Sequence, residues 1–242
     1  MTASLTRLQS FHGALDAHAL LGAMIYDEFK DKITLVSSFG ADSALLIALV
    51  AEVSRDVPIL FLETDKHFQE TLDYVKRLKD FFHLTDVRLL RPDPKLINNV
   101  DKAGDLWKHQ PNRCCWIRKV EPLERELAQS GFEAIITGRK GYQNKEREGL
   151  ETIELFDDGI YRINPLATWD KPRLKDEFAL RDLPQHPLVA EGYLSIGCEP
   201  CTTPVKPGDD ERSGRWAHTA GLHGAQKTEC GIHVQDVPDW NL

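Results

Sequence analysis

The stretch Ile33–Ser43 has the sequence ITLVSSFGADS, and the apolar run Ala44–Val53 follows it at once. A β-rich run, a turn of small polar residues and a helical run predict a buried strand, a loop and a helix in that order. Small residues let backbone N–H groups approach an anion, and a helix N-terminus adds positive potential. The loop is therefore a candidate phosphate site, although an ordinary turn whose Ser and Asp residues cap the helix would have the same sequence.

The alternation of strand and helix continues on both sides of this stretch. The sequence predicts helices at 16–29, 69–82 and 114–129, and further buried strands at 57–62, 87–90 and 134–137. Strands that alternate with helices of this length form parallel βαβ units. We therefore expect an α/β fold, with an open, mostly parallel twisted sheet and flanking helices.

The sequence changes character after the fourth strand. Residues 152–163 contain two short β-rich runs around Asp157–Gly159, which is a typical hairpin turn, and 170–182 is expected to be helical. The last forty or so residues show little periodicity and many glycines and prolines. We expect one α/β domain over residues 1–201 and a mobile C-terminal tail over residues 202–242.

The composition excludes several classes of protein. Thirty Lys and Arg residues and 38 Asp and Glu residues give a formal net charge of −8, which argues against a protein whose role is to bind bulk nucleic acid or anionic lipid. No uncharged run reaches the roughly 18 residues of a membrane span. The first residues lack the basic start and apolar core of a secretory signal. We expect a cytoplasmic protein without a nucleic-acid or membrane partner.

Four of the five cysteines are spaced as metal ligands. Cys114 and Cys115 are adjacent, and Cys198 and Cys201 form a CxxC pair. The odd total excludes a complete disulfide framework. One CxxC is a common zinc half-site, but adjacent thiolates converge poorly on one small ion, whereas a cubane offers each thiolate its own iron. The spacing favours a [4Fe–4S] cluster over zinc; the alternative is that the adjacent pair is simply buried, small and unliganded.

The fifth cysteine, Cys230, lies in the segment KTECGIH (Lys227–His233). A free thiol is only a few per cent ionised at neutral pH, so a nucleophilic cysteine needs positive charge nearby. Lys227 and His233 supply some of it, and an anion site with Arg212 and Arg215 would supply more. The segment is therefore a candidate for nucleophilic chemistry, and the alternative is a tail cysteine without a chemical role.

A basic loop with the sequence TGRKGYQNKER, Thr137–Arg147, leaves the end of the fourth predicted strand. Ligands in open α/β sheets bind at the carboxyl ends of strands, so this loop is expected to face the loop of the first strand. The alternative is a charged loop that only meets solvent.

Taken together, these segments resemble the sulfonucleotide reductase family over most of the chain. The blocks that carry the resemblance are Ser38–Ser43, Cys114-Cys115 with Lys119, Gly192–Thr202, and Arg215-Trp216 with Lys227–His233. The last two blocks are highly specific, whereas the first is weak by itself. The resemblance implies a fold of the adenine-nucleotide α-hydrolase type, and reduction of adenylyl sulfate in sulfate assimilation and cysteine biosynthesis.

The resemblance also implies a set of roles for the cysteines. Cys114, Cys115, Cys198 and Cys201 would hold a [4Fe–4S] cluster of electrostatic and architectural importance, and Cys230 would be the catalytic nucleophile. Its attack on the sulfur of adenylyl sulfate would give an S-sulfocysteine and AMP. Thioredoxin or a similar dithiol donor would then release sulfite. The oligomeric state is left open, with a homo-oligomer among the possibilities.

The residues expected to contact the substrate come from several loops and from the tail. They are Ser38, Phe39, Gly40, Asp42, Ser43, Thr64, Lys119, Gly138, Arg147, Arg212 and Arg215. The cations Lys119, Arg212 and Arg215 are expected to neutralise sulfate and phosphate charge. Asp65, Gly141 and Asn144 depart from the residues usual in the family, which leaves individual nucleotide contacts open near them.

Three other functions are carried as alternatives. The first is a reductase of the 3′-phosphorylated substrate that carries a cluster. Most reductases of that substrate lack the four cysteines, but some have them. The second is an ATP-pyrophosphatase-type tRNA thiolase, which normally needs a Ser-Gly-Gly-x-Asp-Ser loop where this chain has Phe39. The third is a non-enzymatic binding module that uses all five cysteines structurally.

Overall fold

The computed structural model describes residues 4–143, 147, 149–219, 227 and 229–233. A six-stranded sheet forms its centre, with the strand order β3-β2-β1-β4-β6-β5. The strands are β1 Ile33–Ser37, β2 Ile59–Leu62, β3 Val87–Leu90, β4 Ala134–Ile136, β5 Ile153–Leu155 and β6 Tyr161–Ile163. All neighbouring strands are parallel except β5 and β6, which form the antiparallel hairpin at one edge. The predicted fold class is confirmed.

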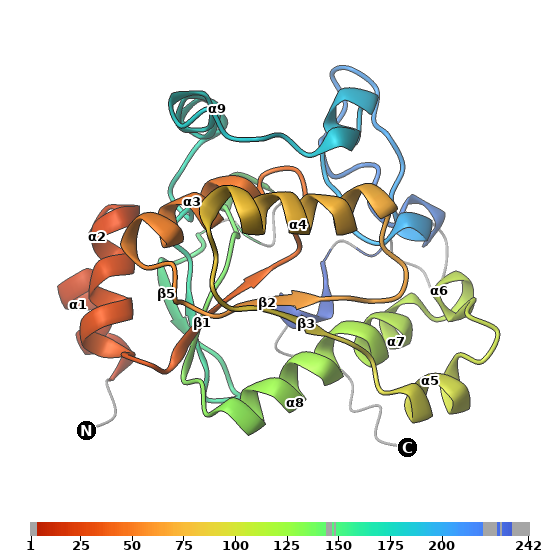
Figure 1. Cartoon of the computed structure of the whole chain (residues 1–242), viewed down its shortest axis with the longest axis horizontal. Helices are drawn as coiled ribbons and strands as arrows, with labels where there is room; N and C mark the ends of the chain where they lie inside the picture. The colour runs from red at the N-terminus through yellow and green to blue at the C-terminus, as the bar shows by residue number, and fades with distance from the viewer. Residues whose placement is uncertain (1–3, 144–146, 148, 220–226, 228, 234–242) are drawn as a thin grey trace.

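Helices cover both faces of the sheet (Figure 1). They are α1 Leu5–His12, α2 Ala17–Gly22, α3 Ser43–Val53, α4 Gln69–Phe82, α5 Pro94–Val100, α6 Leu106–His109, α7 Pro111–Cys115, α8 Glu121–Ser130 and α9 Lys171–Leu180. Among the described residues, no helix is long and apolar enough to cross a membrane.

Alternate residues of the strands build two separate cores. Leu35 and Phe61 point to the face that α1 to α4 cover, and they belong to the larger apolar cluster. Val36 and Leu60, one position along each strand, point to the opposite face and pack with Leu123 and other residues of α8. The alternation follows from the two-residue period of a strand, and burial on both faces explains why β2 is wholly apolar and β1 mostly so.

The helix predicted at 114–129 is present but is longer and less regular than expected. It runs from α7 through a π-helical segment, Trp116–Val120, into α8. The backbone N–H of Glu121 donates to the carbonyl of Trp116, which is the wider spacing of a π-helix. Such segments are frequent at functional sites. The predicted helix at 16–29 is likewise α2 followed by a π-helical segment, Ala23–Glu28.

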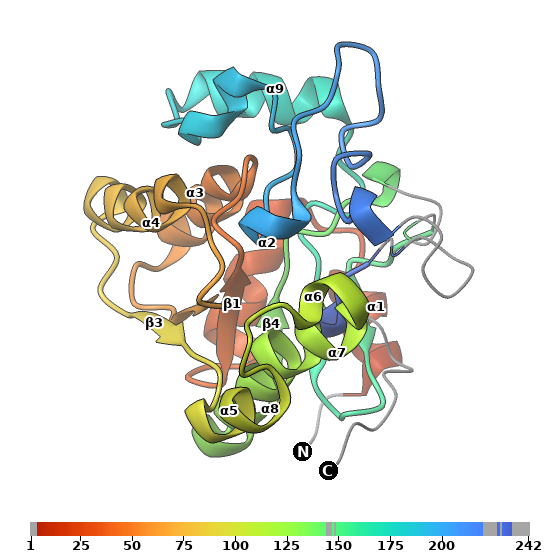
Figure 2. The same cartoon turned by 90° about the vertical axis from the view of Figure 1, so that its right-hand side faces the viewer.

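The described part of the 202–242 segment lies against the domain. The N–H of Thr203 donates to the carbonyl of Gly214 at 3.0 Å, and the N–H of Trp216 donates to the carbonyl of Cys201 at 2.9 Å. A short 3₁₀ turn, Gly231–His233, lies beside the π-helical segment that follows α7 (Figure 2). Residues 220–226, 228 and 234–242, where the rest of the predicted tail falls, lie outside the described residues, as does Asn144. The mobility of the tail stays a prediction.

The topology determines where a ligand site can form. The chain moves outward from β1 to β2 and β3, then returns to place β4 on the other side of β1. The loops after β1 and β4 therefore diverge and leave a crevice at the carboxyl ends of these two strands, which is the usual ligand position in open α/β sheets.

Candidate active site

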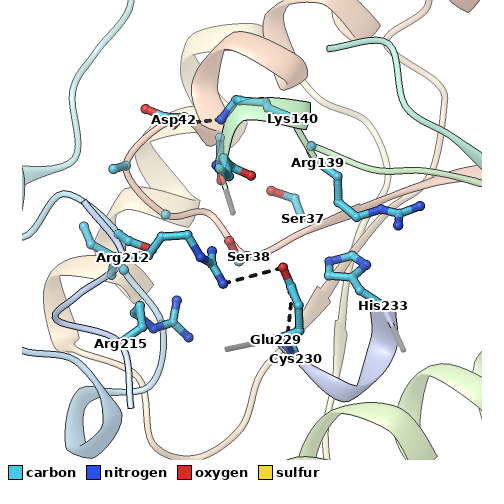
Figure 3. Close-up of a pocket in the computed structure, with 18 of the residues that line it drawn as sticks. Ser37, Ser38, Asp42, Arg139, Lys140, Arg212, Arg215, Glu229, Cys230 and His233 are labelled. Atoms are coloured by element: carbon cyan, nitrogen blue, oxygen red, sulfur yellow. Dashed lines mark hydrogen bonds and ion pairs between the residues drawn. The ribbon is translucent and has the colours of Figure 1, made fainter. Parts of the chain in front are cut away.

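A cavity of about 190 Å³ lies at the carboxyl ends of β1 and β4. Its walls come from the loop after β1, the loop after β4, the segment 194–197 and two parts of the tail, 211–216 and 229–233. Figure 3 shows side chains from these separate segments pointing toward one another across the cavity. Sheet-borne loops and the tail thus enclose one site.

The loop after β1 is anchored in the core by Phe39. This residue has a left-handed backbone, with φ of +47°, and its fully buried ring packs edge-to-face with the ring of Phe61, the two ring centres lying 5.4 Å apart. Ser37 Oγ accepts the N–H of Phe39 at 3.1 Å. A Cβ at Gly40 would lie 3.1 Å from the carbonyl of Ile196, so glycine permits the close approach of the two segments. Phe39 therefore shapes the loop from below, and it does not line the cavity.

The loops after β1 and β4 are joined by an ion pair. Lys140 Nζ donates to Asp42 at 2.8 Å, and the lysine is 3% exposed. The neighbouring Arg139 is held by Glu154 of β5, and its burial lowers the pKa of the guanidinium. The β4 loop therefore presents cations that are fixed in place, which is the arrangement electrostatic binding of an anion requires.

The tail is attached to the β4 loop by Glu229. Arg147 donates to its carboxylate from Nε at 2.6 Å and from a second nitrogen at 3.0 Å, and Arg212 lies 3.8 Å away. Burial alone would raise the pKa of Glu229, but the hydrogen bonds and charge of Arg147, with charge from Arg212, lower it to about 2. The carboxylate also accepts the backbone N–H of Cys230 at 3.3 Å. One side chain thus ties Cys230 to the domain.

Arg215 enters the cavity over a glycine. A Cβ at position 197 would lie 2.6 Å from Arg215 Cζ, so a side chain there would displace the guanidinium from its observed position. The backbone of Arg215 pairs with Thr202, directly after the CxxC turn. The adjacent residues Gly197 and Cys198 therefore position the Arg215 cation and a thiol, respectively.

Cys230 faces the cavity and contacts Cys115. A hydrogen bond from the Cys115 thiol lowers the pKa of Cys230 well below its ordinary value against the effect of burial, and Lys119, the N–H of Ile232 and Lys227 lower it further. The last three contributions do not depend on a proton at Cys115. The site thus favours the thiolate, which is the nucleophilic form of cysteine.

A second, smaller cavity lies beside the first and is lined by the other four cysteines. The shared lining residues of the two cavities are Lys119, Arg215 and Trp216, and the cysteines are Cys114, Cys115, Cys198 and Cys201. Burial raises the pKa of Cys114 to about 11 and that of Cys201 to about 12. Thr64, fully buried, hydrogen-bonds Cys198 Sγ at 3.3 Å and so lies here rather than at the first cavity.

The donors around the second cavity fit an anionic iron–sulfur cluster. Arg118 Nε and Arg215 Nε are buried N–H donors without a hydrogen-bond partner in the described part of the chain, and both residues line this cavity. Sulfide and thiolate sulfurs would accept from them. In the same described part, no three His, Cys, Asp or Glu side chains form a site for a metal ion. The four thiols therefore surround one space without converging on one point.

Comparison with known proteins identifies the family. A model described as the phosphoadenosine phosphosulfate reductase domain matches residues 32–204. The chain is 44% identical over 230 residues to the adenosine 5′-phosphosulfate reductase of Mesorhizobium japonicum, covering 95% of this chain and 87% of that protein. The chain belongs to the phosphoadenosine phosphosulfate reductase family.

One further relative agrees with this assignment, and one solved structure shares the fold. The adenosine 5′-phosphosulfate reductase 2 of Bacillus subtilis is 37% identical over 212 residues, covering 87% of this chain and 86% of that protein. The crystal structure of phosphoadenylyl-sulfate reductase from Candida auris superposes with a TM-score of 0.70 at 24% identity, over 84% of this chain and 99% of that one. The resemblance stated from the sequence is confirmed, and this member of the reductase family is an oxidoreductase that acts on sulfur.

Most residues singled out in the sequence meet at the first cavity of this reductase-family member. Cys230 lines it together with Ser38, Gly40, Asp42, Ser43, Lys119, Gly138, Arg147, Arg212 and Arg215. Phe39 and Thr64 lie elsewhere, the first in the core beneath the loop and the second against Cys198. Their roles in binding substrate stay predictions.

Several residues that line the first cavity were not singled out in the sequence as contacts. Arg139 and Lys140 belong to the basic loop of the sequence but carried no individual signal. Glu229 precedes Cys230, and its partner Arg147 lies 82 residues away, so no local pattern could pair them. His233 is half-buried, and desolvation of its ring lowers its pKa well below the usual value, with Arg139 and Arg147 acting in the same direction.

Proposed function

We propose that this protein reduces adenylyl sulfate to sulfite and AMP with Cys230 as the nucleophile. The observation that carries the proposal is the position of Cys230, in one cavity with Lys119, Arg147 and Arg215 at the carboxyl ends of β1 and β4. The names of the relatives support the same substrate. Sulfate assimilation in the cytoplasm is the corresponding cellular role.

The first half-reaction is a displacement at sulfur. The Cys230 thiolate attacks the sulfur of adenylyl sulfate, an S–S bond forms, and the bond from sulfur to the bridging oxygen breaks. AMP leaves with that electron pair, and the enzyme keeps an S-sulfocysteine. Lys119 and Arg215 neutralise the sulfonate as charge moves to the phosphate, each charged hydrogen bond being worth roughly 1.5–3 kcal/mol.

The nucleotide is bound by the sheet side of the cavity. The loop after β1 offers small residues and backbone N–H groups, and Lys140 bridges it to the loop after β4. Arg147 and Arg212 already hold the carboxylate of Glu229, so their positions are fixed before a phosphate arrives. Such preorganisation costs no rearrangement during the reaction.

The second half-reaction needs two electrons from outside the chain. If Cys114, Cys115, Cys198 and Cys201 hold the cluster, Cys230 has no resolving thiol in its own chain. An external dithiol, for which thioredoxin is the proposed donor, attacks the Cys230 sulfur and expels sulfite. Its second thiol then attacks the mixed disulfide, which frees Cys230 and leaves the donor oxidised.

The cluster proposed for the second cavity is a [4Fe–4S] cubane held by those four cysteines. When bound, it supplies charge and rigidity beside the nucleophile, and neither half-reaction passes an electron through it. Lys66, Arg118, Lys119 and Arg215 line this cavity, and their positive charge would offset the negative charge of such a cluster.

Mass spectrometry of single half-reactions tests the proposal. Adenylyl sulfate alone should give one sulfite-sized adduct on the Cys230 peptide and one equivalent of AMP, and reduced thioredoxin should remove the adduct. Cys230→Ser should form no adduct. Parallel assays with the 3′-phosphorylated substrate decide between the two sulfonucleotides, and a higher kcat/KM for that substrate would reverse the assignment. Turnover by Cys230→Ser would refute the two-step scheme.

A further inference from the structure

Trp216 stands between the two cavities. It lines the substrate cavity and also the cysteine cavity, and it is only 2% exposed. Its side chain packs with Cys198 and Cys201 in one apolar cluster, against which Trp107 and Cys230 also pack. Trp216 is therefore a wall shared by the site of the nucleophile and the site of the four thiols.

Three side-chain cations lie over the ring of Trp216. Arg215 Cζ is 4.3 Å from a ring centre, Lys227 Nζ is 5.5 Å away and Arg212 Cζ is 5.9 Å away. Cations this close to one another repel, and the negative face of an indole offsets that repulsion, since tryptophan is the strongest cation–π partner among the side chains. Arg212 and Arg215 both line the substrate cavity. The indole ring therefore stabilises a cluster of positive charge beside the substrate cavity, where an anion would bind.

The backbone of Trp216 itself has an unfavourable conformation. Trp216 has φ of +51°, in the left-handed region that bulky residues rarely adopt. The conformation is held from both sides: its N–H donates to the carbonyl of Cys201 at 2.9 Å, and its carbonyl accepts the N–H and hydroxyl of Thr219 at 2.8 and 2.7 Å. Strain that the surrounding structure maintains in this way is concentrated at functional sites.

We propose that Trp216 is a positioning residue with two tasks. Its ring aims Arg212 and Arg215 at the bound anion, and its bulk separates the cysteine cavity from the substrate cavity. The inference rests on the proposed function only in taking the anion to be the phosphosulfate or phosphate of the nucleotide. Trp216 acts on that anion through the two arginines.

Two substitutions separate the tasks, and Trp169 provides a matched control. Trp216→Leu keeps apolar bulk but removes the aromatic face, whereas Trp216→Phe keeps a weaker one. Trp169 is also buried, at 4% exposure, with Arg173 Cζ 4.1 Å from a ring centre, yet it lines neither cavity. Trp169→Phe and Trp169→Leu therefore remove a comparable ring elsewhere. Thermal unfolding of each variant gives its folded fraction.

The first experiment measures the binding of AMP and of inorganic sulfate by calorimetry at several salt concentrations. Trp216→Leu should weaken AMP binding about tenfold and make the affinity less dependent on salt, and Trp216→Phe should recover most of the affinity. The Trp169 variants should bind as the wild type does. With adenylyl sulfate, KM should rise more than kcat falls, because the arginines act on the bound anion.

The cavity arm follows release of iron to a chelator by loss of visible absorbance from protein purified without oxygen. Release should be several-fold faster in Trp216→Leu than in the wild type and the Trp169 variants. Wild-type affinity for AMP and sulfate in Trp216→Leu would overturn the inference; if the leucine variant does not fold, Trp216→Met, which also lacks an aromatic face, takes its place with the same expected loss and the same contrary outcome. A wild-type protein that binds sulfate but neither AMP nor adenylyl sulfate would overturn the proposed function instead.

Discussion

The two sides of the first cavity are built in different ways. The sheet side consists of the loops that directly follow the buried strands β1 and β4. The loop after β1 ends at Ser43, where α3 begins. The tail side has short turns only among its described residues and depends on distant partners. Lys227 Nζ donates to Asn112 at 2.6 Å across 115 residues, and His218 Nε2 lies 3.3 Å from the carbonyl of Trp107 across 111 residues.

Under the proposed mechanism, the two sides would have different roles. The sheet edge would hold the part of the substrate that does not react, because its geometry is set by the core. The proposed nucleophile, Cys230, lies on a segment held by a few ion pairs and hydrogen bonds, which could open to a second reactant at low free-energy cost. We therefore expect substitutions on the sheet side to weaken substrate binding, and substitutions on the tail side to slow the reaction itself.

The largest effect is expected where the tail meets the CxxC turn. Cys198→Ser removes one of the four thiols that line the second cavity, and the purified protein should lose its brown colour, its iron and its activity. Cys230→Ser is the matched control, because its thiol belongs to the tail and the colour should stay. Iron and acid-labile sulfide analysis measures both. Stoichiometric zinc without sulfide in anaerobically prepared wild type would contradict the cluster.

The next effect concerns the cation that the same turn positions. In Gly197→Ala the new methyl group would lie within van der Waals overlap of the Arg215 guanidinium, 2.6 Å from its Cζ. Displacement of one charged hydrogen bond should lower kcat/KM about 10- to 100-fold. Gly22→Ala is the control, since a Cβ at this helical glycine meets nothing within 4 Å. Equal kinetics of the two variants would exclude a binding role for Arg215.

The sheet side could be predicted from the sequence because its determinants are local. A β-rich run, small turn residues and a helical run in one stretch of 21 residues predict β1, its loop and α3, and the observed strand, Ile33–Ser37, begins where that stretch begins. The alternation of such units then predicts a parallel sheet and a site at its carboxyl edge. The β5–β6 hairpin follows from Asp157–Gly159 in the same way.

The rest depends on interactions that a single sequence does not display. The short helices α1, α5 and α6 have weak or brief periodicity and were not predicted. Glu229 is a single acidic residue until the fold brings Arg147 to it. The left-handed backbone of Phe39 contradicts the usual preference of a bulky residue, and packing against Phe61 together with the hydrogen bond to Ser37 Oγ holds it.

A smaller effect is expected at the link between the two sides. Glu229→Gln removes the charge that Arg147 binds but keeps the shape, so about a tenfold loss of kcat in single-turnover adduct formation is expected. Because the folded pKa of about 2 lies below the ordinary value of a carboxyl, this link contributes stability above pH 4.5 that is lost as the pH falls toward 2. The wild-type rate should show no titration of Glu229 between pH 5 and 9, as a pH profile of both proteins can verify. A faster variant would mean that Glu229 competes with substrate for Arg147.

The smallest effect on activity is expected far from the cavity, in the core, where the change should appear in stability instead. His186 is 1% exposed, and its Nδ1 accepts the N–H of Leu188 at 3.2 Å, so Nε2 carries the proton and donates to Thr71 Oγ1 at 3.0 Å. Protonation would place a second N–H against that of Leu188, and burial lowers the pKa to about 4. Because the unfolded chain takes up this proton near pH 6.5, stability should fall between pH 6.5 and 4 by up to about 1.4 kcal/mol per pH unit. His186→Asn keeps an acceptor for Leu188 without a titrating ring, and its urea-unfolding free energy should decline less over that range. If both proteins lose stability at the same rate, the acid sensitivity resides elsewhere, and the ion pairs that attach the tail become the groups to replace.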